Sequence, residues 1–229
     1  MRHNLSVVRI KAVYNALGPL QQKVVFVGGA VVQLYADRMT DEVRPTDDVD
    51  IIVEIVTYHE YSLLEEQLRK MGFTNDIYSK VICRYQINGI IVDIMPTGKN
   101  VLDFKSDWYP DGFKNSVDYK IDERTIIRIL KVEYFIASKI EAFKDRGNND
   151  GRTSTDFEDI IYVFENRKSV WTDMNSSSKR VKKYLIEQLS ILIVNKYFEE
   201  WVGAHANFGN PPATYYILEQ LKLFCNQKS

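Results

Sequence analysis

The sequence predicts an α+β fold, in which a mixed sheet with flanking helices is followed by a C-terminal helical bundle. Short β-branched runs bounded by turn signals lie in the first half, and helical periodicity continues almost unbroken from about Val132. The apolar fraction of 45% and the charged fraction of 27% are ordinary for a folded globular protein. We therefore expect an α/β domain over residues 1–125 and a helical domain over residues 126–229.

Each element of the first half has a local signal. Apolar spacing predicts a helix over residues 5–17, ended by Gly18-Pro19, and a second helix over residues 30–38. A helix over residues 58–72 ends at a glycine. Strands are expected within residues 23–29, 47–55, 78–86 and 90–95, with Asn88-Gly89 forming a tight hairpin turn between the last two. Residues 41–46 are expected to form a loop, and residues 99–122 an irregular segment.

The apolar spacing of the second half predicts four helices. We expect them over residues 133–146, 155–167, 178–202 and 213–224, with residues 207–212 interrupting the pattern. Thr155 and Glu158 are spaced for a capping box at the start of the second of these helices.

Charge and cysteine content argue against several classes of protein. Thirty basic against 31 acidic residues give a net charge of −1, so the chain lacks the basic excess of a dedicated nucleic-acid binder. Two cysteines are too few for a disulfide scaffold and fit reduced thiols. The most apolar stretch, residues 24–36, is too short to span a bilayer, and no signal peptide opens the chain. We therefore expect a cytoplasmic protein without membrane association.

Gly28 and Gly29 lie between a predicted strand and a predicted helix. Glycine there lets the backbone approach a ligand closely, and the N–H groups that open a helix attract phosphate. Strand–glycine–helix turns are also common without any ligand, so this feature alone decides little.

Asp48 and Asp50 stand two residues apart on a predicted strand, so their carboxylates point to the same face. Such carboxylates repel each other, and a bound Mg²⁺ or Mn²⁺ relieves that repulsion. The competing interpretation is an acidic strand end exposed to solvent. The apolar continuation through Ile51 and Ile52 leads the strand into a core and favours the metal site.

Asp93 lies inside the apolar run IIVDIM, where an unpaired carboxylate is costly to bury. A metal shared with Asp48 and Asp50 would stabilise it. An ion pair with a basic residue such as Arg84, on the neighbouring predicted strand, would do the same.

The order of these features resembles the nucleotidyltransferase superfamily with the polymerase-β-like fold. The matching residues are the VGG turn at Val27 to Gly29, the DVD segment at Asp48 to Asp50, and Asp93. A more specific resemblance is to the AbiEii-type branch, which includes MenT-like toxins. It rests on three segments, RPTDDVDIIV, ASKIEAFKDRG and TDFEDI. Thr155 departs from that branch, where a lysine usually precedes the helical aspartate.

The resemblance implies a nucleotidyltransferase-type mixed sheet and a metal-dependent transfer of a nucleoside monophosphate from an NTP. It assigns Asp48, Asp50 and Asp93 as catalytic residues and ligands of two Mg²⁺ or Mn²⁺ ions. It assigns nucleotide binding to the following residues: Gly28, Gly29, Arg44, Thr46, Lys139 and Asp156. Arg44 and Thr46 could instead order the loop before the strand, and Lys139 and Asp156 also fit ordinary helix positions.

The same resemblance favours tRNA or a protein as the acceptor, hence a toxin-like role with an antitoxin partner. The near-neutral charge keeps a small-molecule acceptor, such as an aminoglycoside, as an alternative. A third hypothesis is a non-catalytic module that binds a nucleotide or a partner protein.

Overall fold

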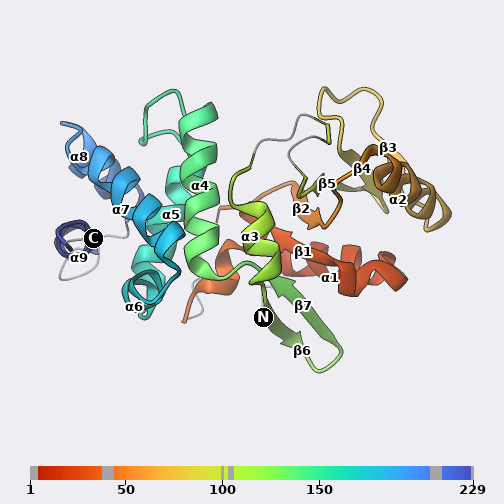
Figure 1. Cartoon of the computed structure of the whole chain (residues 1–229), viewed down its shortest axis with the longest axis horizontal. Coiled ribbons are helices and arrows are strands. Elements are labelled where there is room, and N and C mark those ends of the chain that lie inside the picture. Colours follow the sequence, from red (N-terminus) through yellow and green to blue (C-terminus); the bar gives the residue numbers. More distant parts are fainter. Residues whose placement is uncertain (1–4, 38–43, 99–100, 103–105, 207–212, 228–229) are drawn as a thin grey trace. The chain divides into compact units, whose positions relative to one another are not determined.

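The computed structural model describes residues 5–37, 44–98, 101–102, 106–206 and 213–227. The chain forms two compact units, and the second begins mainly after Lys131 (Figure 1). The first unit comprises Met1–Leu34 and Glu42–Lys131, and the second comprises Tyr35–Asp41 and Val132–Ser229. The short segment from Tyr35 therefore belongs with the helical unit, although it precedes most of the sheet in sequence.

The first unit contains a mixed sheet of seven strands within the described residues, in the order β3-β4-β5-β2-β1-β7-β6. The β2–β5 and β1–β7 pairs are parallel, and the other neighbouring strands are antiparallel. The bounds are β1 (Val24–Val27), β2 (Asp48–Val53), β3 (Thr74–Asn75), β4 (Arg84–Ile87), β5 (Ile90–Pro96), β6 (Val117–Asp122) and β7 (Thr125–Ile129). All four residues of β1 are buried, as expected of a central strand with both faces covered.

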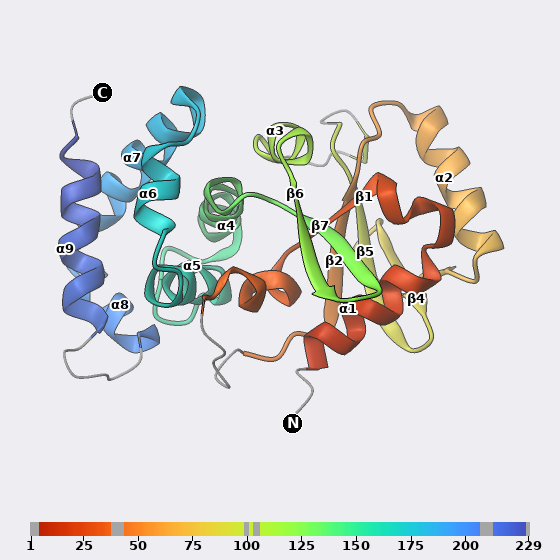
Figure 2. The same cartoon turned by 90° about the horizontal axis from the view of Figure 1, so that it is seen from below.

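Helices accompany this sheet, and α1 contacts β2, β5 and β7 (Figure 2). They are α1 (Leu5–Ala16), η1 (Gly18–Lys23), η2 (Gly29–Tyr35), α2 (Tyr58–Lys70) and α3 (Tyr109–Lys114). A complete capping box between Thr57 and Glu60 begins α2. Gly72, with φ of +91°, follows its end. The hydroxyl groups of Tyr61 and Tyr85, 3.1 Å apart, join α2 to β4.

The second unit is helical throughout its described residues. It comprises α4 (Val132–Arg146), α5 (Thr155–Asn166), α6 (Val170–Asn175), α7 (Lys179–Ile193), α8 (Phe198–His205) and α9 (Ala213–Cys225). Phe157 of α5 lies at the centre of an aromatic cluster, in contact with Phe143, Phe198 and Trp201. None of the helices in the described part of the chain has the length and apolar character that a bilayer crossing demands.

The predicted α+β class, mixed sheet and helical second half are confirmed, and several details differ. The helix after Gly29 is a seven-residue 3₁₀ helix. Strand β4 begins only at Arg84, because residues 78–83 form turns. The segment expected to be irregular contains α3 and part of the β6–β7 hairpin, whose alternation is masked by charged residues on exposed positions.

Two helix boundaries also differ from the prediction. Ser154, not Thr155, caps α5, and its hydroxyl accepts a hydrogen bond from the amide of Phe157. The helix expected over residues 178–202 is two helices, separated by a turn in which the Asn195 side chain accepts a bond from the Tyr197 amide. The predicted break over residues 207–212, and residues 41–43 of the predicted loop, lie outside the described residues.

Candidate functional site

Three carboxylates from two neighbouring strands converge on one face of the sheet in the first unit. Asp50 of β2 pairs in register with Asp93 of β5, and Asp48 lies two residues before Asp50 on the same face. One oxygen from each of the three lies within 4.8 Å of the other two. Residues 45 positions apart in sequence thus meet because β2 and β5 are adjacent and parallel.

The alternation of β2 explains this orientation. Val49 and Ile51 are fully buried on the opposite face, whereas Asp48 and Asp50 are half-buried. Asp93 is more enclosed, with 7% of the residue exposed. The strand therefore presents two acidic groups at an accessible end while its apolar side chains anchor it in the core.

Gly28 lies against Asp50, where any larger side chain would collide with the carboxylate. Its φ is +71°, and a Cβ atom built there would lie 1.8 Å from Oδ2 of Asp50. Only glycine allows the turn after β1 to pass so close to that carboxylate. Gly29 begins the 3₁₀ helix η2, which is too short and tightly wound to serve as the expected α-helical N-terminus.

Arg84, at the start of β4, places a cation among the carboxylates. Its Nε and Nη2 donate to the two oxygens of Asp93 at 2.8 Å each, and Nη2 donates to Asp48 at 3.4 Å. The hydrogen bond with Asp93 raises the pKa of Arg84 above its ordinary value. Sequence reasoning named Arg84 only as an alternative partner of Asp93, and the structure shows that pairing.

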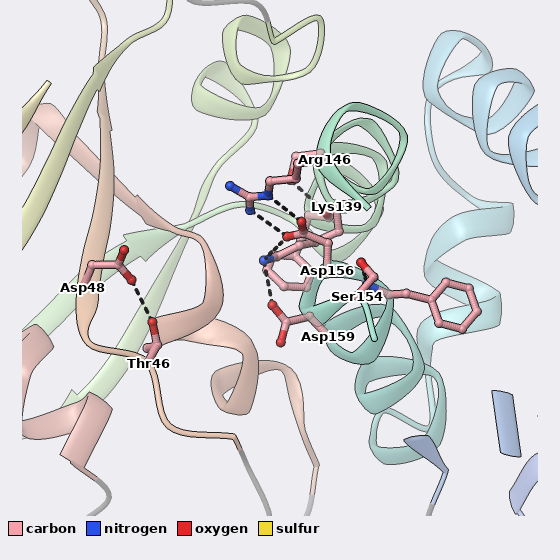
Figure 3. A network of polar contacts seen from close by, with 10 residues as sticks. Thr46, Asp48, Lys139, Arg146, Ser154, Asp156 and Asp159 are labelled. Carbon is pink, nitrogen blue, oxygen red and sulfur yellow. Dashed lines mark hydrogen bonds and ion pairs between the residues drawn. The ribbon is translucent and has the colours of Figure 1, made fainter. Parts of the chain in front are cut away.

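Thr46 orients Asp48 from the preceding segment. The buried Thr46 donates its hydroxyl hydrogen to Oδ1 of Asp48 at 2.8 Å (Figure 3). Arg9 of α1 donates to the carbonyl of Thr46 and, at 3.4 Å, to Asp47. Arg44 is half-buried at the start of the same segment. No sequence signal singles out Arg9, because a lone arginine on an amphipathic helix is ordinary.

Cys83 is a buried thiol next to Arg84. Burial, followed by the negative charge of Asp93, raises the pKa of Cys83 to about 12. The thiol is therefore protonated at neutral pH and has little nucleophilic character.

Lys139 and Asp156, both predicted to bind nucleotide, lie in the second unit within a buried charge network. Lys139 is 5% exposed, and its Nζ contacts Asp156 at 3.0 Å and Asp159 at 2.6 Å (Figure 3). Arg146 closes the network, its Nε and Nη2 donating to the two oxygens of Asp156 at 2.7 and 2.9 Å. The Arg146 side chain is 67% exposed.

The network stabilises the charged forms of its members. Burial alone would lower the pKa of Lys139, but Asp159 and Asp156 together raise it above its ordinary value. Burial alone would raise the pKa of Asp156, but the hydrogen bond from Arg146 and the charge of Lys139 lower it. The positive charges of Lys139 and Arg146 thus compensate the buried carboxylates of Asp156 and Asp159.

Comparison with known proteins places the fold in a class. No family model and no curated protein matches the sequence. The fold does match solved structures, and it is the nucleotidyltransferase-type mixed α/β fold.

The matched structures are those of ANT(2'')-Ia, an aminoglycoside nucleotidyltransferase described as an antibiotic-resistance factor. Its solution structure matches with a TM-score of 0.50 and 14% identity, covering 79% of this chain and 89% of that one. Its crystal structure with adenylyl-2''-tobramycin matches with a TM-score of 0.51 and 13% identity, covering 82% and 99% of the two chains. At this identity the likeness shows the fold, and the AbiEii-type branch finds no support in it.

Proposed function

We propose that this protein is a nucleotidyltransferase that transfers a nucleoside monophosphate from an NTP to a hydroxyl group of a small polar molecule. The observation that carries the proposal is the convergence of Asp48, Asp50 and Asp93 on one face of a nucleotidyltransferase-type sheet.

The three carboxylates fit a site for Mg²⁺ or Mn²⁺. Their oxygens are hard ligands, they come from rigid adjacent strands, and they lie close enough to share a cation. When bound, divalent cations would neutralise the negative charge of the triphosphate and of the leaving pyrophosphate.

The chain's own residues then have distinct roles. Thr46 fixes the carboxylate of Asp48 through its hydrogen bond, and Gly28 leaves the space that Asp50 occupies. Asp93 accepts the proton of the acceptor hydroxyl. The hydroxyl oxygen forms a bond to the α-phosphorus, the bond from that phosphorus to pyrophosphate breaks, and the proton passes from Asp93 to solvent.

A small-molecule acceptor is better supported than tRNA or protein. The matched fold belongs to a protein whose structure holds adenylyl-2''-tobramycin, a nucleotide joined to a small molecule. The net charge of −1 also offers no general attraction for RNA. The toxin-like role with an antitoxin partner remains the second candidate, resting on the resemblance of the RPTDDVDIIV and TDFEDI segments.

The predicted nucleotide contacts remain predictions at all six positions: Gly28, Gly29, Arg44, Thr46, Lys139 and Asp156. For Lys139 and Asp156 the buried network supplies a sufficient structural role. Comparing the NTP affinity of the wild type with that of each single variant by calorimetry tests these six positions.

Intact-mass analysis tests the proposed reaction. The protein is incubated with Mg²⁺ and each NTP, and with an aminoglycoside panel, total tRNA or candidate proteins as acceptors. We expect a nucleotide-sized mass gain on a small molecule, and a loss on the order of a thousandfold in Asp48→Ala and Asp50→Ala. Asp47→Ala is the matched control, because Asp47 directly precedes Asp48 in the chain and its side chain is 92% exposed.

Three other outcomes are informative. A mass gain on tRNA or protein would support the toxin-like role instead. Mg²⁺-dependent NTP binding without pyrophosphate release would indicate a non-catalytic binding module. Transfer that persists in both aspartate variants would remove the basis of the proposal.

A further inference from the structure

Arg84 lies beside the three carboxylates and contacts two of them. Its guanidinium contacts both oxygens of Asp93 at 2.8 Å and one oxygen of Asp48 at 3.4 Å. A single side chain thus joins two of the three groups proposed to hold divalent cations.

Sheet register explains why Arg84 lies there. Arg84 of β4 pairs with Asp93 of β5, which pairs with Asp50 of β2. Residues in register on adjacent strands point to the same face, so the three side chains form a row across the sheet. The position is therefore fixed by the backbone ladder and does not depend on a flexible loop.

The geometry of the pair with Asp93 is that of a strong interaction. A guanidinium that donates through two N–H groups to both oxygens of a carboxylate forms a charge-assisted, bidentate pair. The side chains of Arg84 and Asp93 are only 23% and 10% exposed, so solvent weakens the pair little. The contact with Asp48 is longer, and Asp48 is the more exposed carboxylate.

These contacts mean that Arg84 and a divalent cation would compete for the same carboxylates, Asp48 and Asp93. Each oxygen of Asp93 accepts one of these short hydrogen bonds, so a divalent cation bound to the same carboxylate would lie close to the positive charge of the guanidinium and be repelled by it. A guanidinium cannot lose its charge at neutral pH, so it can leave a carboxylate only by moving.

We propose that Arg84 is a resident counter-ion that holds the carboxylates together before divalent cations bind, and that it must release Asp93 before Asp93 becomes a ligand. Arg84 thereby lowers the affinity of the site for divalent cations and makes Asp93 the last of the three carboxylates to engage. Arg84 is a positioning residue in this role. The inference rests on the proposed metal site, but its test does not depend on nucleotide transfer.

Titration with Mn²⁺, followed by the electron paramagnetic resonance of the free ion, tests the proposal on the full chain without nucleotide. We expect Arg84→Met to bind Mn²⁺ about tenfold more tightly or better, because one positive charge leaves the site. Arg84→Lys keeps the charge and should stay within about threefold of the wild type. Arg124→Met is the control, since Arg124 is exposed in the β6–β7 turn at the other edge of the sheet. Equal or weaker Mn²⁺ binding by a folded Arg84→Met protein would overturn the proposal.

A measurement on the wild type covers the case in which Arg84→Met does not fold. The Nε–H signal of Arg84, assigned by its disappearance in Arg84→Lys, reports the hydrogen bond to Asp93 in a ¹H–¹⁵N spectrum. We expect Mg²⁺ to shift this signal markedly, and an unchanged signal at saturating Mg²⁺ would contradict the release of Asp93.

The two proposals can fail separately. Tighter Mn²⁺ binding by Arg84→Met, with no transfer to any acceptor, would keep the role of Arg84 and reject the enzyme. Nucleotide transfer by the wild type, together with unchanged Mn²⁺ affinity in Arg84→Met, would keep the enzyme and reject the role of Arg84.

Discussion

Each unit of this protein contains a cluster of aspartates and basic residues, and the two clusters differ in exposure. In the first unit, the guanidinium of Arg84 contacts Asp48 and Asp93, and Asp50 lies beside them. In the second unit, Asp156 and Asp159 face two cations, Lys139 and Arg146. Asp48 and Asp50 of the first cluster are half-buried, whereas both carboxylates of the second cluster are buried and contact two basic side chains.

Under the proposed function, this difference makes the first cluster a ligand site and the second a stabilising element of the fold. Buried carboxylates need compensation at all times, which Lys139 and Arg146 provide within the chain. Acidic groups that remain accessible to solvent can take up a further cation. Removing a cation should therefore damage folding in the second unit and change metal affinity in the first.

The largest expected effect is on folding, in Lys139→Met. This change leaves Asp156 and Asp159 without the ammonium between them, and we expect the free energy of unfolding to fall by about 3–5 kcal/mol. Urea denaturation followed by circular dichroism measures it. Lys144→Met on the same helix removes an exposed lysine and should cost about 0.5 kcal/mol or less. An unchanged stability together with weaker NTP binding would instead make Lys139 a phosphate ligand.

An intermediate effect is expected for Gly28→Ala, which acts on the first cluster. Gly28 and Gly89 both have positive φ, +71° and +75°, so alanine strains the backbone at either position, by about 1 kcal/mol. Only at Gly28 does the added methyl group collide with Asp50, whereas Gly89 has open space. We expect Gly28→Ala alone to weaken Mn²⁺ binding and nucleotide transfer, by about tenfold. Equal effects of the two substitutions would mean that Gly28 does not position Asp50.

The smallest effect concerns the pH dependence of the second cluster, tested with Arg146→Met. Because the pKa of Asp156 is lowered by folding, its contribution to stability is present above the unfolded value of about 3.9 and is lost as pH falls through the folded pKa. Arg146 is largely exposed, so its removal should cost about 1 kcal/mol or less at pH 7.

The same reasoning gives the direction of the change in acid. The difference between wild type and Arg146→Met should shrink as Asp156 becomes protonated in acid, first in the folded variant, where Arg146 no longer lowers its pKa, and at lower pH in folded wild type. Urea midpoints measured from pH 7 to pH 3 check this. A difference that grows in acid would show that Arg146 does not act through Asp156.

Much of the candidate site could be predicted from sequence, because alternation along a strand fixes which side chains share a face. Asp48 and Asp50 follow from that rule alone. That Asp93 joins them depends on β2 and β5 being parallel neighbours, which one strand's pattern does not contain. The resemblance to nucleotidyltransferases supplied that pairing.

Other features were outside the reach of local patterns. The contact of Arg84 with two aspartates depends on the register of β4, and the cap of α5 at Ser154 differs by one residue from an equally good sequence signal. The β6–β7 hairpin was missed because every residue of β6 is exposed or half-buried and its charged residues hide the alternation. The contacts of Arg84 and the β6–β7 hairpin both depend on strand pairing, which the pattern of a single segment does not contain.

The segment that begins at Tyr35 determines whether the two units can be separated by cutting the chain once. Its ring contacts Phe135, its carbonyl accepts a bond from Arg167, and Asp37 bonds with the backbone of Asn166 and Lys168. The polypeptide thus passes into the helical unit, returns to complete the sheet, and passes over again after Lys131. No single peptide-bond cleavage yields two intact halves, so a fragment starting at Val132 would lack a piece of its own core.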